Sequence, residues 1–152
     1  MTAEVMWTEY KRNVPEGTSY EAWAFGGITP ESPDLLADLT ARGIKTATAS
    51  AYPFYVVEKC PLPQPGDHSI ILNRAGDAVC IIRTTKVTVV PFYDVSAEHA
   101  YKEGEGDRSL RFWRECHTEA FRNELTEIHE TFSENMLVVC EEFKVVYPNR
   151  KG

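Results

Sequence analysis

The segment Gly43-Ile44-Lys45-Thr46-Ala47-Thr48 separates two different sequence patterns. Before it, Leu35, Leu36 and Leu39 recur at helical spacing, and glycine is the residue that commonly follows a helix. After it the residues favour a β-strand. We therefore predict a helix-to-strand turn, which would present a lysine and a threonine hydroxyl, three residues apart, to one pocket. The segment lacks the glycine run of a phosphate-binding P-loop.

The elements expected on either side of this turn alternate irregularly between helix and strand. Before it we expect a helix over residues 3–13, a strand over 20–25 and a helix starting near Thr29-Pro30. After it we expect a proline-rich connection with at most a helical turn, a hairpin of strands 69–73 and 78–90, helices over 96–103 and 109–130, and a strand over 136–147. This order predicts an α+β fold in which helices surround a small curved sheet or barrel.

One domain over residues 1–152 is the expectation for a chain with 43% hydrophobic residues, which suffice for one core. The N-terminal residues carry charges that do not suit a signal peptide, and no apolar run approaches the roughly 18 residues that span a bilayer. We therefore expect a cytoplasmic protein without a membrane partner. The net charge of −7 argues against a broad basic surface for long duplex nucleic acid, but allows a local nucleotide pocket.

The cysteines and histidines lack the spacing of a metal site, so neither a metal nor another cofactor is predicted. His117 lies in the apolar stripe of the 109–130 helix, and we expect it to be a hydrogen-bonded core residue. The cysteines are expected to be reduced and to act as small core residues; they are Cys60, Cys80, Cys116 and Cys140.

Four segments together resemble the ASCH domain, a relative of the PUA-like β-barrels. They are the G-x-K-x-x-T element of Gly43, Lys45 and Thr48, the stretch Trp23-Ala24-Phe25-Gly26, the stretch EHAYKEGEGD from Glu98 to Asp107, and the closing run 138–147. The resemblance covers nearly the whole chain. It implies a mostly antiparallel PUA-like barrel of five to six strands with flanking helices, a cleft, and an association with RNA or modified nucleosides.

The same resemblance implies a set of catalytic residues. Some short bacterial members are amidohydrolases that deacetylate acetylated cytidine with a lysine, a threonine and a glutamate, which correspond here to Lys45, Thr48 and Glu103. Glu105 is the competing glutamate. Other members resemble ribonucleases. The chain differs from the short amidohydrolases in its length and in its N-terminal and 109–130 helices, and three functions stay open: amidohydrolase of an acylated nucleoside, ribonuclease on single-stranded RNA, and non-catalytic RNA-binding module.

The three residues make a coherent acyl-transfer site if they meet. A desolvated Lys45 would take the proton of Thr48, which would attack the acyl carbon, and Glu103 would orient the lysine or protonate the leaving amine. An ionised Glu103 beside Lys45 would instead favour the ammonium and oppose its use as a base. A neutral Glu103 or a bridging water would resolve that conflict.

Further residues near the turn are expected to bind the substrate. Aromatic rings would stack on a base, although core packing is the commoner role of buried aromatics, and an arginine would meet a phosphate or a base edge. The candidates are Trp23, Phe25, Gly43, Tyr52, Asp107 and Arg108. The sequence gives no indication of an oligomeric state.

Overall fold

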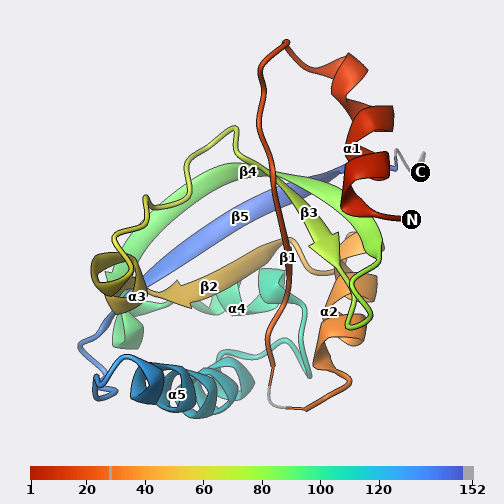
Figure 1. The fold of residues 1–152 in the computed structure, drawn as a ribbon. Coiled ribbons are helices and arrows are strands. Elements are labelled where there is room, and N and C mark those ends of the chain that lie inside the picture. Colours follow the sequence, from red (N-terminus) through yellow and green to blue (C-terminus); the bar gives the residue numbers. More distant parts are fainter. Residues whose placement is uncertain (28, 149–152) are drawn as a thin grey trace.

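Five strands form one curled sheet in the order β1-β3-β4-β5-β2 (Figure 1). Their bounds are β1 Glu21–Ala24, β2 Ala47–Ala51, β3 His68–Leu72, β4 Ala78–Pro91 and β5 Leu137–Tyr147. β1 and β3 pair in parallel and all other neighbours are antiparallel. The expected small, mostly antiparallel barrel is confirmed as a half-barrel of five strands in the computed structural model, which describes residues 1–27 and 29–148.

The helices lie around this sheet. They are α1 Ala3–Tyr10, α2 Ser32–Ala41, α3 Tyr52–Val57, α4 Ala97–Glu103 and α5 Leu110–Glu127, with 3-10 turns η1 Lys11–Asn13 and η2 Phe92–Asp94. Serine caps begin α4 and α5, since Ser96 accepts a hydrogen bond from the His99 amide and Ser109 accepts one from the Phe112 amide. Such side chains satisfy amide groups that the first helical turn leaves unpaired.

The two longest strands give the sheet its curvature. β4 and β5 pair from Ile81 to Pro91, and their register shifts between Ile81 and Ile82 and again between Thr84 and Lys86. Such irregularities bend the strands and increase their twist. The sheet therefore curls, and β1 and β2 are its two edges.

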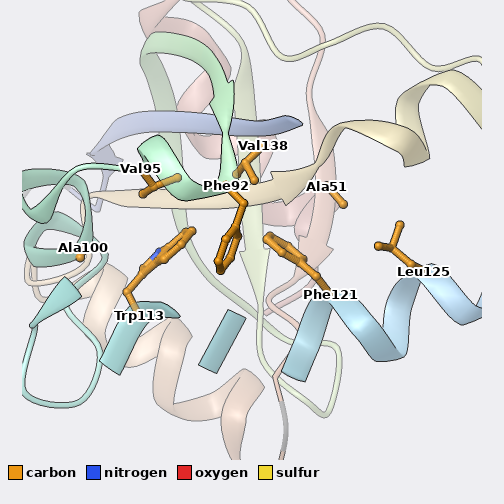
Figure 2. Packing of buried hydrophobic residues seen from close by; sticks show 8 residues of the cluster. All are labelled: Ala51, Phe92, Val95, Ala100, Trp113, Phe121, Leu125 and Val138. Carbon is orange, nitrogen blue, oxygen red and sulfur yellow. The ribbon is translucent and has the colours of Figure 1, made fainter. Parts of the chain in front are cut away.

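Three apolar clusters join the helices to the sheet. In the first, α5 presents Trp113, Phe121 and Leu125 to Phe92 and to the strands β2 and β5 (Figure 2). α2 covers a second cluster around Phe25 and Ile82, and α1 covers a third around Ile70 and Ile81. Burial of this kind stabilises by about 25 cal/mol per Å² of apolar surface, and it holds α4, α5 and the strand edges in fixed relation.

Several expectations need adjustment at the level of single elements. α5 is shorter than the 109–130 run, α1 ends in the 3-10 turn η1, and the proline-rich connection begins with the six-residue helix α3. None of the four cysteines forms a disulfide in the described residues, but of the four only Cys80 is buried, and Cys60 is exposed, so the expectation that all four are core residues is wrong. Cys60 follows α3 in the irregular connection, where little packs against it.

Candidate active site

A cleft of about 650 Å³ lies beside the two edge strands of the sheet. β1 contributes Glu21 and Trp23, and β2 contributes Thr48 and Ser50. The cleft continues past the ends of these strands to α3 and to the connection before β3; further lining residues include Tyr55, Pro61, Leu62, Pro63, Asp67 and His68. A volume of this size is within the range of small-molecule sites.

The β2 side of the cleft is polar because alternate residues of a strand point to opposite faces. Ala47 and Ala51 are fully buried, whereas Thr48 and Ser50 line the cleft. The Ser50 hydroxyl lies 2.7 Å from the Tyr55 hydroxyl. Among the described residues, the Thr48 hydroxyl has no hydrogen-bond partner, so it is free to meet a ligand.

Glu141 lies beside Thr48 in the neighbouring strand. The two residues are Cα partners in the β2–β5 ladder, and both line the cleft. The Thr84 hydroxyl donates a hydrogen bond of 2.6 Å to Glu141 Oε2. Burial raises the pKa of Glu141, the Thr84 hydrogen bond lowers it, and the nearby carboxylates of Asp67 and Glu21 raise it further. The carboxyl therefore keeps its proton to higher pH than an exposed glutamate does.

The opposite side of the cleft is aromatic and carries no cationic side chain. Trp23 meets Phe25 edge to face, with ring centroids 4.8 Å apart. Within the described part of the chain, three carboxyl groups line the cleft, from Glu21, Asp67 and Glu141, and no lysine or arginine does. The cleft thus combines apolar rings with negative charge.

Lys45 lies outside this lining and is buried, with 1% of its surface exposed. Its Nζ is 3.3 Å from Glu103 Oε1 and 3.0 Å from Glu105 Oε2, and it also donates to the Glu103 carbonyl at 3.4 Å. The ring centroid of Phe25, which lines the cleft, is 5.1 Å from Nζ. The lysine is therefore an ammonium held between two carboxylates next to the aromatic wall.

Glu103, at the end of α4, is the centre of this buried cluster. Its Oε2 accepts hydrogen bonds from Trp113 Nε1 at 2.5 Å and from His99 Nε2 at 2.7 Å, and His117 Nε2 lies 3.4 Å from Oε1. Burial alone would raise the pKa of Glu103, but the charges of His117 and Lys45 outweigh it and hold the pKa well below the usual range. Glu103 is thus ionised and fully partnered. We call Lys45, Glu103, Glu105, His99, His117 and Trp113 the buried ionic cluster.

A tight loop after α4 places Glu105 over Lys45, next to Glu103 at the end of the helix. Gly104 has a φ of +72°, and a Cβ atom there would lie 2.8 Å from the Ile44 carbonyl oxygen. Gly106 has a φ of +59°, and a Cβ atom there would lie 2.5 Å from the Phe112 ring. Only glycine combines this backbone conformation with such close approach, which explains the alternating E-G-E-G pattern.

The structure brings together some of the residues expected from the sequence and separates others. Lys45, Glu103 and Glu105 meet, but within residues 1–27 and 29–148 no hydrogen bond or ion pair joins them to Thr48. Trp23 and Phe25 line the cleft. Tyr52 does not, because it begins α3, and Tyr55 one turn later takes that place.

The remaining candidates hold the loop near Lys45. Gly43 follows α2, and its amide donates to the Thr40 carbonyl. Asp107 accepts a hydrogen bond from the Ser109 amide, at the start of α5. Arg108 lies over the Tyr101 ring, 3.7 Å from its centroid, and donates to the Tyr101 carbonyl. None of the three lines the cleft.

Sequence reasoning missed the residues that lie beside Thr48 in the cleft. Glu141 and Thr84 lie in strands that were expected, but strand pairing alone decides which of their side chains share a face with Thr48. An acidic pair inside a largely apolar strand, Glu141-Glu142, is the signal that was available. In the described residues there is no cluster of three potential metal ligands, and no described helix has the length and apolar character of a membrane span.

Comparison with known proteins places the chain in one family. Residues 21–147 match the family model of the ASCH domain. The ASCH domain structure from Lactobacillus crispatus JV V101 is 32% identical with a TM-score of 0.87, over 95% of this chain and 93% of that one. Protein EF3133 from Enterococcus faecalis V583 is 36% identical with a TM-score of 0.85, over 94% of this chain and 86% of that one. No match was found among curated proteins.

Proposed function

The chain belongs to the ASCH domain family, and on that premise we propose that its cleft binds a nucleoside and hydrolyses an acyl group from it. The substrate class is a modified nucleoside acylated on its exocyclic amine, such as acetylated cytidine. The free Thr48 hydroxyl carries the proposal, because it is a nucleophile in a cleft of nucleoside size between aromatic and polar walls.

The charge of the cleft favours a nucleoside over a polynucleotide. Glu21, Asp67 and Glu141 line it without a lysine or arginine among the described residues. A phosphate bound there would meet carboxylates at short range, which is unfavourable in a partly desolvated site. An uncharged base meets no such penalty and gains from stacking on Trp23 or Tyr55, at about 1–3 kcal/mol per base.

In the proposed reaction, Thr48 Oγ1 attacks the acyl carbon and loses its proton. The C–N bond breaks, the amine leaves with a proton, and water then cleaves the threonine ester to release the acid and restore the hydroxyl. Lys45 and Glu103 act as positioning residues in this proposal. They fix the turn that leads into β2 and place a positive charge next to the Phe25 wall.

The test is hydrolysis of acetylated cytidine by the wild-type chain, by Thr48→Val and by the control Thr46→Val. Thr46 donates its hydroxyl to the Lys102 carbonyl and lies outside the cleft lining. We expect Thr48→Val to lose at least about 10³-fold in kcat, as nucleophile removal does in other acyl-transfer enzymes, and Thr46→Val to keep its rate. Binding of cytidine to Thr48→Val is expected to persist.

Parallel assays distinguish the other two functions. Labelled single-stranded RNA is incubated with the same proteins, and binding of cytidine is compared with binding of its 5′-monophosphate. Preference for the nucleoside supports the proposal. Cleavage of RNA without deacylation would replace it with the ribonuclease, and RNA binding without either reaction would replace it with the non-catalytic module.

A further inference from the structure

Thr48 needs a group that takes its proton, and the buried ionic cluster is poorly placed to supply it. Lys45 Nζ is occupied by Glu103 and Glu105 and has no contact with Thr48 among the described residues. The base must therefore come from the cleft itself.

Glu141 is positioned for this purpose by strand pairing. Thr48 and Glu141 are direct partners in the antiparallel β2–β5 ladder. Directly opposite residues have Cβ atoms about 4.5–5.5 Å apart and point to the same face, and here both residues line the cleft. A hydroxyl and a carboxylate at this separation reach hydrogen-bond distance through side-chain rotation.

Thr84 fixes the orientation of the Glu141 carboxyl. Thr84 is buried, and its hydroxyl donates to Glu141 Oε2 at 2.6 Å. In the described chain, Oε1 has no hydrogen-bond partner. One oxygen is held and the other is left for Thr48 or for a substrate amine, which resembles the way a base is oriented by a third group in catalytic triads.

The surroundings of Glu141 suit a proton-transfer role. Among the described residues, the titratable groups that line the cleft with it are Tyr20, Glu21, Tyr55, Asp67 and His68. The pKa of Tyr55 is itself raised, by burial first and in part by Glu141. Burial and these carboxylates raise the pKa of Glu141. A general base works best when its pKa approaches the operating pH.

We propose that Glu141 is the acid–base residue of the cleft and Thr84 its positioning residue, an inference that rests on the acyl-nucleoside hydrolysis proposed above. The Glu141 carboxylate takes the Thr48 hydroxyl proton as the new C–O bond forms. It returns that proton to the amine nitrogen as the C–N bond breaks. In the second half it takes a proton from the attacking water and gives it to Thr48 Oγ1 as the ester cleaves.

The experiment measures kcat against pH on acetylated cytidine for the full chain and for Glu141→Gln, Glu141→Asp and Glu142→Gln. Glu142 is the matched control, because it is the next residue of β5 but binds Lys102 at 2.8 Å, away from the cleft. We expect Glu141→Gln to lose about 10²–10⁴-fold in kcat, the usual contribution of a general base, while cytidine affinity changes less than about threefold. Glu141→Asp should recover part of the rate, and Glu142→Gln should match the wild type.

Each possible result decides a different question. Loss of the acidic limb of the pH profile in Glu141→Gln, with thermal stability and cytidine binding retained, supports the proposal. Wild-type kcat and pH profile in Glu141→Gln, beside an inactive Thr48→Val, would overturn the role of Glu141 and leave the hydrolase intact. An inactive wild-type chain would overturn both, and only that result removes the hydrolase.

Discussion

The turn from Gly43 to Thr48 contributes residues to two regions that differ in whether their polar atoms have partners. In the buried ionic cluster, Lys45 and Glu103 are each 1% exposed, and their polar atoms are partnered. In the cleft, Thr48 and one oxygen of Glu141 are unpartnered within the described chain. A buried polar network whose hydrogen bonds are all made is rigid, whereas a polar atom without a partner in the protein can bind a ligand. On the function proposed above, the cluster therefore supports the structure and the cleft carries out the reaction.

The largest expected effect is loss of the cluster's cation. Lys45→Met leaves Glu103 and Glu105 without their shared ammonium, and breaking a buried ion pair costs about 3–5 kcal/mol. The free energy of unfolding, measured by urea denaturation, should fall by this amount. The control Lys86→Met removes an exposed lysine that is 3.8 Å from Glu142 and should change stability far less. Equal losses in the two variants would contradict the structural role of Lys45.

The second prediction tests the loop that follows Glu103 and carries Glu105. Gly104 and Gly43 have nearly the same φ, +72° and +76°, but only Gly104 closely approaches another residue, the Ile44 carbonyl. Gly43→Ala should cost roughly 1–2 kcal/mol from its backbone conformation. Gly104→Ala should cost about 1–3 kcal/mol more, since the added methyl overpacks the site. Thermal denaturation of both variants measures the difference, and similar losses would show that the close approach has no energetic weight.

The sequence predicted the cluster better than the cleft. The helix end at Gly43, the hairpin of residues 69–73 and 78–90, and the break between the 96–103 and 109–130 helices follow from local signals, because glycine marks each of these turns. The family pattern added the link between Lys45 and Glu103, which lie far apart in the sequence. These parts of the fold can be predicted from short segments, because each depends on neighbouring residues in the sequence.

The missed residues depend on pairing between distant strands. Glu141 and Glu142 are adjacent, yet one lines the cleft and the other binds Lys102. Which of them reaches the cleft is fixed by the register of β5 against β2 and by the shifts against β4. A shift of one residue would exchange the two faces. Likewise, Trp113 lies in the apolar stripe of α5, which indicates a core residue. The stripe does not indicate that the Trp113 ring nitrogen donates a hydrogen bond to Glu103.

The smallest expected effect tests whether Glu141 acts as a general base or only supports the structure. In the wild type, the hydrogen bond from Thr84 to Glu141 Oε2 lowers the pKa of Glu141. Thr84→Val removes this bond, so the pKa of Glu141 should be higher in the variant. A base acts as the carboxylate, and its activity is lost as pH falls through its pKa. The acidic limb of kcat should therefore move to higher pH, and the plateau should fall only about two- to tenfold, the worth of one hydrogen bond.

The control for this variant is Thr85→Val, whose exposed hydroxyl donates to the Glu142 carbonyl at 3.2 Å and does not contact Glu141. Its pH profile should match that of the wild type. If the limb stays in place in Thr84→Val while the plateau falls, Thr84 supports packing alone and another group titrates in the profile. A shift of the limb in Thr84→Val alone would link proton transfer to the cleft, because within residues 1–27 and 29–148 no hydrogen bond or ion pair joins Thr84 to the buried ionic cluster.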